Sequence, residues 1–569
     1  MSKGRDFKFR RQDNIGAADA DDDGYLQECF VDTGDLETLL DCCNPKSIVV
    51  GRTGAGKTAL LKVVENRTQR CIIIPPESLS LSYISNSTIL KFVEHLGVNL
   101  DIFYRLLWRH VFTVELVKNH FKIYSEDDKK TFWQKIRYRF TDQRNRKALE
   151  YLENWGKSFW EETEYRIKEV TKKLEKDIHG QIETALPIGA LAGQVGGSYK
   201  ISDEKKSEIV ERAQKVVNDV QIRQLSDIIS LLDEILDDPQ KRYYVLIDRL
   251  DEDWVESRLR YRLIRALVET IRDFRKIKNA KIVIAIRQDL LDRVFRIIRG
   301  AGFQEEKYDA MYVRISWSDQ QLHEIMDKRL NRLLKNKYTK QPLKIEDILP
   351  ISIDGQKPGE YIVRRTLKQP RDVIHLVNKC IEQVIDKKRI TADAMKRAER
   401  EYSRDRLRYL ADEWHSDIPN LLECAKVLRK QRYRFPIQSL DKPCEEFCLD
   451  FACENLGSND PDVNSYLSQL AFQTANANSD LELFRNSLVQ AFYKIGILGI
   501  KLESYDSYLW SSGQRVSIST TEIDDRTKLE VHPAFWRVFG IVNKEAYVSL
   551  RSTRETRHGK IKGKIKGSF

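Results

Sequence analysis

The stretch that decides the fold runs from Ser47 to Val64: Ser-Ile-Val-Val-Gly-Arg-Thr-Gly-Ala-Gly-Lys-Thr-Ala-Leu-Leu-Lys-Val-Val. Its opening run, Ser47 to Val50, is short, apolar and rich in β-branched residues, which is typical of a buried strand. Its closing run, Ala59 to Val64, favours a helix. The residues between them match GxxxxGK[ST] at every required position. A strand, a glycine loop and a helix therefore follow one another, which is the context that this motif requires.

The glycines of this loop predict a site for the phosphates of ATP. They let the backbone curl so that its N–H groups point inward, and the helix that starts near Lys57 adds the positive end of its dipole. Lys57 is expected to reach the β and γ phosphates, and Thr58 to offer its hydroxyl to Mg²⁺. An incidental glycine turn is the alternative, and the flanking elements weigh against it. The predicted ATP-binding residues are Gly51, Arg52, Thr53, Gly54, Ala55, Gly56, Lys57 and Thr58.

Further strand-like runs predict the rest of a sheet. Tyr243 to Ile247 and Lys281 to Ile286 have the same apolar, β-branched character as the first strand, and Cys71 to Ile74 and Met311 to Trp317 are weaker examples. Helical patterns lie between them, such as the apolar spacing of three and four from Leu225 to Leu236. Alternating strands and helices predict an α/β fold with a parallel sheet.

Carboxylates follow the Tyr243 strand. Asp248 comes directly after it and is expected to hold Mg²⁺ together with Thr58. A strand that ends in aspartate is common, so this interpretation depends on its agreement with the glycine loop. Asp251 and Glu252 are the nearest candidates for the base that activates water, and the alternative is that they cap a helix beginning near Trp254.

Arginines near the strand ends are candidate phosphate contacts. Arg287 follows the Lys281 strand, where a sensor of the γ-phosphate would lie, and the alternative is a salt bridge to Asp289 or Asp292. Three later arginines could reach the nucleotide of a neighbouring subunit or could form a solvated helix face. They are Arg293, Arg296 and Arg299.

Composition narrows the class of protein. The chain has 569 residues, 41% of them hydrophobic and 32% charged, and no apolar run approaches the length of a membrane span, so we expect several domains and a cytoplasmic protein without membrane contact. Nine cysteines at irregular spacing fit a reducing compartment. A metal site at Cys444, Cys448 and Cys453 is the alternative to ordinary buried thiols, and no histidine lies near them.

Taken together, the loop, the Asp248 strand, Ile282-Val283-Ile284-Ala285-Ile286-Arg287-Gln288-Asp289, and Gln369-Pro370-Arg371-Asp372 before a helix resemble bacterial P-loop ATPases of the AAA+/STAND group. The resemblance covers about Asp35 to Trp414 and extends to the layout of origin-recognition and KAP-type ATPases, some of which are linked to anti-phage defence or mobile elements. It implies that Arg371 contacts the γ-phosphate, whereas the alternative pairs it with Asp372 or Glu382. Members of the group often have two acids in a row after the strand that ends at the Mg²⁺ carboxylate, whereas this chain has Asp248-Arg249. This departure concerns ATP hydrolysis rather than ATP binding.

The resemblance also implies a domain order. The C-terminal region, with Leu483 to Ile495 as a recognition-type helix and Gly496 to Leu502 as a strand, resembles a winged helix that binds DNA or serves as a protein-contact module. The glycine-rich stretch Pro187 to Tyr199 lacks the Lys-Ser/Thr of a second phosphate loop and is interpreted as a linker. The expected parts are an N-terminal segment (1–34), a P-loop core (35–325) with a helical insertion at about 86–220, a helical lid (326–414), a winged-helix-like domain (415–550) and a basic tail (551–569).

These features favour an ATP-dependent switch or motor that requires Mg²⁺ and works as a homo-oligomer or with an effector protein. The alternative is a nucleotide-gated scaffold with little turnover that binds DNA or RNA through the C-terminal domain and the basic tail. A small-molecule phosphotransferase built on the same loop ranks last, because no acceptor pocket is apparent in the sequence and such kinases are usually far smaller.

Overall fold

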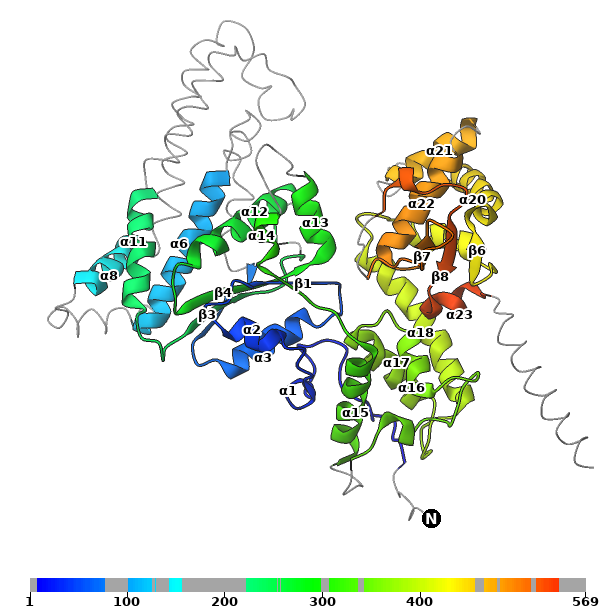
Figure 1. Cartoon of the computed structure of the whole chain (residues 1–569), viewed down its shortest axis with the longest axis horizontal. Coiled ribbons are helices and arrows are strands. Elements are labelled where there is room, and N and C mark those ends of the chain that lie inside the picture. Colours follow the sequence, from blue (N-terminus) through cyan, green and yellow to red (C-terminus); the bar gives the residue numbers. More distant parts are fainter. Residues whose placement is uncertain are drawn as a thin grey trace, which may run out of the picture. The chain divides into compact units, whose positions relative to one another are not determined.

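The computed structural model describes residues 8–76, 101–124, 128, 143–155, 222–252, 254–255, 257–297, 306–335, 342–455, 465–477, 481–512 and 518–541 (Figure 1). The chain divides into two compact units. The sheet unit comprises Asp32–Ser316, and the helical unit combines Met1–Val31 with Trp317–Phe569. The finer boundaries expected at 325 and 414 stay predictions.

The predicted parallel α/β sheet is confirmed in the sheet unit. Its strands are β1 (Ile48–Gly51), β2 (Cys71–Ile73), β3 (Tyr243–Ile247), β4 (Ala280–Arg287) and β5 (Tyr312–Arg314). They pair in the order β2-β3-β4-β1-β5, and every pairing is parallel. All residues of β1 and β3 are buried, which explains their uninterrupted apolar character in the sequence.

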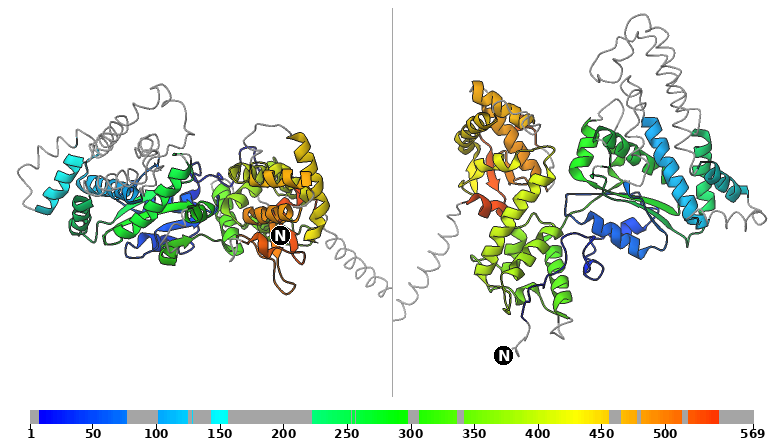
Figure 2. Two further views of the ribbon diagram at one scale, coloured as in Figure 1. Left: turned by 90° about the horizontal axis from the view of Figure 1, so that it is seen from above. Right: turned by 180° about the vertical axis from the view of Figure 1, so that it is seen from behind.

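Helices cover both faces of the sheet (Figures 1 and 2). On one face lie α2 (Asp35–Leu40) and α3 (Lys57–Arg67), and on the other lie α6 (Asp101–Phe121), α12 (Ser257–Phe274) and α13 (Gln288–Ile297). The amphipathic pattern of α12 accounts for its position, because Leu263, Ile264, Leu267 and Ile271 recur at helical spacing and all are buried. The described residues of this unit form three further helices. They are α8 (Gln143–Trp155), α11 (Ile222–Ile235) and α14 (Glu306–Asp309).

The strand register brings the predicted site residues to one edge of the sheet. Gly51 at the end of β1 pairs with Arg287 at the end of β4, and Ile247 at the end of β3 pairs with Ile284 of the same β4 strand. Strand β4 thus lies between the strand that leads into the glycine loop and the strand that leads into Asp248. Because the strands are parallel, their carboxyl ends share this edge, which is where ligands bind in open α/β sheets.

The predicted insertion contributes α6 and α8, and α11 follows it; these three helices form one core with α12. Trp108 and Phe112 of α6 are buried, and Phe112 packs edge-on against Phe274 at the end of α12. His110 shares a 2.7 Å hydrogen bond with Tyr151 of α8, and burial lowers the pKa of His110 to about 3, so this imidazole is neutral at physiological pH. The predicted linker from Pro187 to Tyr199 lies outside the described residues.

The stretch after Trp317 is mostly helical, as predicted. Its helices are α15 (Asp319–Lys335), α16 (Pro358–Arg364), α17 (Pro370–Glu382) and α18 (Ala392–Glu413). The short 3-10 helix η3 (Ile345–Asp347) lies between α15 and α16. Both α16 and α17 begin with proline, whose fixed φ and missing N–H suit the first helical position. Helix α18 is capped by the side chain of Thr391, which accepts a hydrogen bond from the N–H of Ala394.

A small antiparallel sheet with helices follows. Its order is β6-β8-β7, and the predicted helix and strand near Gly496 correspond to α22 and β7. The elements are α19 (Leu421–Cys424), η4 (Ala425–Leu428), β6 (Arg434–Pro436), η5 (Ile437–Leu440), α20 (Asp441–Glu454), α21 (Tyr466–Ala477), α22 (Leu481–Ile495), β7 (Leu498–Lys501), η7 (Thr520–Glu522), β8 (Lys528–Val531), η8 (Pro533–Phe535) and α23 (Trp536–Phe539). The basic tail at 551–569 lies outside the described residues.

The N-terminal segment packs within the helical unit. Phe9 and Ile15 are fully buried, and the N–H and carbonyl of Phe9 hydrogen-bond to Lys387 and Asp386 after α17. The buried carboxylate of Asp23 pairs with the equally buried guanidinium of Arg329 from α15. This segment, which includes α1 (Leu26–Cys29), therefore completes the core around α15 and α17. Among the residues that the structure describes, no helix is both long and apolar enough to cross a membrane.

Candidate functional site

The glycine loop between β1 and α3 forms a turn that only glycine adopts easily. Gly54 and Gly56 have φ angles of 85° and 99°, in the left-handed region, and Gly56 is the residue that precedes α3. A Cβ atom at Gly51 would lie 3.2 Å from that of Ala55, so the loop is also tightly closed at its base. The first turn of α3 begins at Lys57, which places the N-terminal end of this helix and the positive end of its dipole at the loop.

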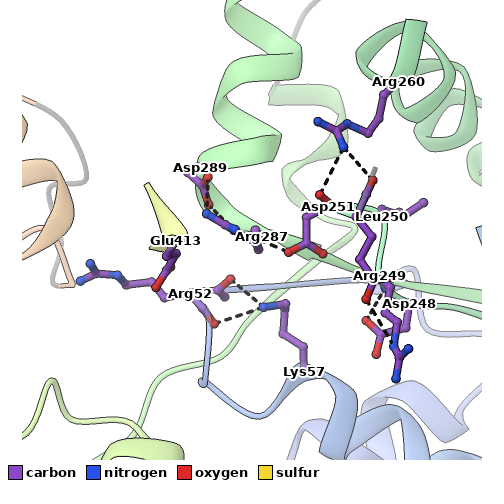
Figure 3. A network of polar contacts seen from close by, with 12 residues as sticks. Arg52, Lys57, Asp248, Arg249, Leu250, Asp251, Arg260, Arg287, Asp289 and Glu413 are labelled. Carbon is purple, nitrogen blue, oxygen red and sulfur yellow. Dashed lines mark hydrogen bonds and ion pairs between the residues drawn. The ribbon is translucent and has the colours of Figure 1, made fainter. Parts of the chain in front are cut away.

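Lys57 is the central cation of this loop. Its ammonium donates hydrogen bonds to the carbonyls of Gly51, at 3.2 Å, and Arg52, at 3.1 Å (Figure 3). Burial lowers its pKa, while the nearby carboxylates of Asp251 and Asp248 act in the opposite direction. The loop thus holds a partly desolvated cation whose present partners are neutral carbonyls. An anion would be a stronger partner for it.

Asp248 lies beside the start of α3, as predicted. Its carboxylate accepts a hydrogen bond from the Thr58 hydroxyl and another from the N–H of Arg249, the latter at 2.8 Å. Burial raises the pKa of Asp248 in spite of these hydrogen bonds and of the Lys57 charge. A hydroxyl and a carboxylate oxygen in contact are a donor set that Mg²⁺ accepts. The structure therefore brings the two predicted metal ligands together.

Arg287 joins the same edge of the sheet from β4. Its guanidinium binds both oxygens of Asp289, at 3.0 and 2.8 Å, and lies 3.6 Å from the carboxylate of Asp251 (Figure 3). Of the two salt-bridge partners weighed from the sequence, Asp289 is correct, and Asp292 instead accepts a hydrogen bond from Gln288. The bidentate geometry holds Arg287 at the carboxyl end of β4. Its role as a sensor stays a prediction.

The two candidate bases have different surroundings. Asp251 faces Arg287 and influences the charge of Lys57, whereas the carboxylate of Glu252 lies 3.7 Å from Arg249, in a pair of half-exposed side chains. The helix expected near Trp254 begins instead at Ser257, so neither acid lies in its first turn. Arg249 has a φ of 58°, a left-handed conformation that turns the chain directly after Asp248.

Arg371 belongs to the helical unit, where it is the second residue of α17. Its guanidinium donates to the carbonyl of Ala18, at 3.2 Å, and lies 3.8 Å from Asp19. The expected alternative, a pair with Asp372 or Glu382, is wrong for Asp372, because that buried carboxylate lies 3.5 Å from Arg406 instead. The contact of Arg371 with a γ-phosphate stays a prediction.

The other arginines considered from the sequence are only partly described. Arg293 donates a 2.9 Å hydrogen bond to the hydroxyl of Tyr261, and its guanidinium also lies over that ring. The side chains of Arg296 and Arg299 lie outside the described residues. A contact with a neighbouring subunit stays a prediction for all three.

The cysteine cluster is made of ordinary thiols. Cys444 and Cys448 are buried in α20, Cys453 is exposed, and burial raises the pKa of Cys448 to about 12. Within the described ranges, no group of His, Cys, Asp and Glu side chains could hold a metal ion by itself. The alternative of a metal site at these cysteines therefore gains no support.

The surroundings of the loop fit a bound nucleotide and its metal. The hydroxyl of Thr53 is buried and has no hydrogen-bond partner among the described residues, and it is followed by the left-handed Gly54, which has no side chain. Lys57, Thr58 and Asp248 supply an ammonium, a hydroxyl and a carboxylate within one small region. These residues would hold a triphosphate through the loop and a divalent ion through oxygen ligands.

The basic residues of the predicted recognition helix are engaged within the protein. Arg485 of α22 is buried and pairs with Asp441, at 2.7 Å, and Asp525, at 3.2 Å. Lys494 lies 2.9 Å from Asp417, with its ammonium over the ring of Trp414. Both side chains are therefore engaged in ion pairs within the helical unit, and a contact of α22 with DNA stays a prediction.

Comparisons with known proteins match part of the chain. Residues 320–411, which span α15 to α18, match the family model of the FunZ-associated C-terminal helical domain. No curated protein matches the chain. Among solved structures, the chain is similar to a Walker-type ATPase of Pyrococcus abyssi at 13% identity and a TM-score of 0.36, over 90% of this chain and 96% of the other. A TM-score of this size does not establish a shared fold, so the function proposed below rests on the chain's own loop.

Two features of the site were not found from the sequence. One is the role of Arg260 in α12, which donates to the backbone of the Asp251 loop and has no recognisable motif. The other is the N-terminal segment, whose acidic run at residues 19–23 gave no sign that Asp19 and Asp23 pair with arginines of the helical unit. Both contacts join residues far apart in the chain, which local spacing cannot reveal.

The raised pKa of Asp248 predicts how its replacement changes stability. In Asp248→Asn, the amide can keep both hydrogen bonds without a buried charge, so we expect the nucleotide-free protein to melt a few degrees higher at pH 7, as about 1 kcal/mol would give. Because a raised pKa means that the wild-type penalty exists only while Asp248 is ionised, the difference should vanish as the pH falls through that pKa. Differential scanning calorimetry at several pH values measures it, and a variant less stable than wild type at pH 7 would contradict this account.

Proposed function

We propose that the chain is a Mg²⁺-dependent ATPase of the P-loop class whose nucleotide is held by the loop Gly51 to Thr58. The observation that carries the proposal is the placement of Lys57, a desolvated cation at the start of a helix, beside the Thr58 and Asp248 pair. Inward-facing amides bind phosphate oxygens without charge of their own, and the ammonium neutralises the β and γ phosphates. Bound Mg²⁺ would neutralise further charge on the phosphates.

The AAA+/STAND layout is the finer part of this proposal. It is supported by the strand order, in which β4 and its terminal Arg287 separate the loop strand from the Asp248 strand. We further propose that the ATP state acts as a switch between the sheet unit and the helical lid, with Arg371 as the contact to the γ-phosphate. In this proposal the C-terminal elements form a winged-helix-like module for protein contact, which the order β6-β8-β7 and the internal pairing of Arg485 support. A homo-oligomer or an effector protein is the expected partner.

Within the site, Asp251 is the favoured base for hydrolysis. Its carboxylate lies on the Lys57 and Arg287 side of the loop, whereas that of Glu252 pairs with Arg249. A base must reach the attacking water near the γ-phosphate, so the residue that faces the phosphate-binding cation has the required position. Arg287, held by Asp289 and Asp251, lies where it can sense the same phosphate.

A nucleic-acid scaffold is the second candidate function, and one surface favours it. Helix α18 carries four exposed arginines at a spacing of three, four and four residues, which places them along one face. The four are Arg397, Arg400, Arg404 and Arg408. A row of exposed guanidinium groups is complementary to a phosphate backbone, and we propose it as a contact in addition to the predicted C-terminal domain and basic tail.

Loss of the Lys57 ammonium tests the proposed function. In Lys57→Ala we expect the affinity for ATP in the presence of Mg²⁺ to fall at least about 100-fold, because a desolvated charge-assisted contact is lost. Binding of a fluorescent ATP analogue measures the affinity, with displacement by ATP as proof of specificity. Lys62→Ala, on the same helix, is the matched control and should bind like wild type. Equal binding by wild type and Lys57→Ala would reject the site.

The two candidate bases are distinguished by their amide variants. Asp251→Asn should lower kcat for ATP hydrolysis about 100-fold or more, and Glu252→Gln should lower it less than about threefold, with ATP affinity preserved in both. Phosphate release under saturating ATP measures kcat. The reverse order of the two variants would assign the base to Glu252, and equal, small effects would exclude both.

The arginine face of α18 predicts salt-dependent binding of nucleic acid. Alanine at Arg397, Arg400, Arg404 and Arg408 together should abolish most binding of a labelled duplex, because each guanidinium would neutralise one phosphate. The slope of log K against log salt concentration should also become less steep by about 0.9 for each contact that is lost. Fluorescence anisotropy between about 50 and 200 mM salt measures the slope. Alanine at Arg485 and Lys494 is the comparison and should leave it unchanged. Wild-type binding without salt dependence, or equal slopes in both variants, would remove this candidate.

A further inference from the structure

Arg260 links helix α12 to the loop that carries the candidate bases. Its side chain is buried, and its Nη1 donates to the carbonyl of Asp251, at 3.3 Å, and to that of Glu252, at 2.7 Å (Figure 3). These are backbone contacts, so they fix the path of the loop rather than the orientation of one side chain. A buried guanidinium between two carbonyls is a directional contact, since its N–H groups lie in one plane.

Asp251 is consequently held from two sides. Arg260 of α12 binds its carbonyl, and Arg287 from the end of β4 lies 3.6 Å from its carboxylate. The start of the loop is also held, because Leu250 is fully buried and its carbonyl accepts a 3.2 Å hydrogen bond from the indole of Trp254. The position of the Asp251 carboxylate therefore depends on the position of α12 relative to β4.

The position of α12 is in turn tied to α6, the first described helix of the insertion. Arg265, Glu269 and Asp273 recur every four residues on the face of α12 that meets α6. Arg265 lies 3.5 Å from Asp101 and Glu269 lies 3.4 Å from Arg105, while Asp273 pairs with Arg109. Between them, the indole of Trp108 donates a 2.9 Å hydrogen bond to the carbonyl of Leu263. This ladder of ion pairs fixes the register of the two helices.

We propose that Arg260 is a positioning residue that holds Asp251 for hydrolysis, and that the insertion controls this position through the α6 to α12 ion-pair ladder. A shift of α6 along its axis moves α12, and α12 carries the Nη1 group away from the two carbonyls. The loop then loses the contact that fixes its path, and Asp251 leaves its place beside Arg287. The inference rests on the proposed ATPase function, and it identifies the insertion as the regulatory part of the same site.

Replacement of Arg260 tests the positioning role. In Arg260→Met, which keeps the length of the side chain and removes its donors, the backbone amides from Leu250 to Trp254 should exchange hydrogen about 10-fold faster in the nucleotide-free protein. The kcat should fall about 10- to 100-fold while the Kd for ATP stays within about threefold. Arg260→Lys, which keeps a charged donor, should bring both the loop exchange rate and kcat back toward the wild-type values. Unchanged exchange of this loop in Arg260→Met would overturn the inference, whatever the activity.

A charge swap tests the link to the insertion. Arg109→Asp breaks its pair with Asp273 and places two carboxylates together, so exchange of the Leu250 to Trp254 amides should rise and kcat should fall. The double variant Arg109→Asp with Asp273→Arg restores an opposite pair and should return both toward wild type. Arg146→Ala is the control, because Arg146 pairs with Glu150 on the surface of α8. Loop exchange unaffected by Arg109→Asp, or unrestored by the double variant, would overturn the link.

Failure of this inference and failure of the proposed function give different results. A wild-type chain that binds no ATP rejects the function, and the exchange measurements, which need no nucleotide, still decide whether Arg260 fixes the loop. A chain that binds and hydrolyses ATP with full kcat in Arg260→Met keeps the function and loses the inference. A chain that binds ATP without hydrolysis also overturns the inference, because Asp251 would then have no reaction to be positioned for.

Discussion

The contact of the Lys57 ammonium with the carbonyls of its own loop is the constraint on which the rest of the sheet unit depends. The ammonium is desolvated, and its pKa is lowered for that reason, yet its hydrogen-bond partners at Gly51 and Arg52 are neutral. Such an arrangement persists only where the surroundings hold it in place. Here strand β1 fixes one end of the loop and helix α3 fixes the other, and left-handed glycines let the backbone close around the cation. Stability is given up at this position in favour of binding.

Charges of alternating sign surround this cation. Asp248 and Asp251 follow β3, while Arg287 ends β4 and Asp289 follows it, and β4 lies between the loop strand and the Asp248 strand. The strand order thereby places two carboxylates within reach of the ammonium and one guanidinium beside them (Figure 3). Each is held by a partner on the protein: Asp248 by the Thr58 hydroxyl, Arg287 by Asp289, and the backbone of Asp251 by Arg260. Binding of a phosphate at Lys57 would add negative charge and so change the electrostatic interactions of Asp248, Asp251 and Arg287 with the ammonium.

The sequence predicted the parts of this arrangement that depend on local pattern. Buried parallel strands are apolar throughout, so β1, β3 and β4 could be located within one or two residues, and the loop motif fixed the start of α3 at Lys57. The choice between Asp251 and Glu252 could not be made, because it depends on the left-handed turn at Arg249 and on Arg287, which is distant in the chain. The start of α12 was also misplaced, since Trp254 and Val255 are buried loop residues that resemble the beginning of a helix.

The helical unit shows the same limit for charged residues. Arg485 in α22 and Arg400 in α18 are both helical arginines that the sequence alone does not distinguish, but the first is buried against Asp441 and the second is exposed. Sequence spacing gave the helices and left open which arginines face inward, because that depends on acids elsewhere in the chain. The match of residues 320–411 to a FunZ-associated helical domain agrees with the helices found there. The contacts of the N-terminal segment with this domain, through Asp23 and Arg329, could not have been predicted without the fold.

The most direct test of the central claim is a crystal structure of the whole chain with Mg²⁺ and a non-hydrolysable ATP analogue. The account predicts that the ammonium of Lys57 leaves the carbonyls of Gly51 and Arg52 and binds the β and γ phosphates. It also predicts that the metal lies between the Thr58 hydroxyl and the Asp248 carboxylate, directly or through a bound water. A structure in which Lys57 keeps its contacts with the loop carbonyls while the nucleotide binds elsewhere would contradict it.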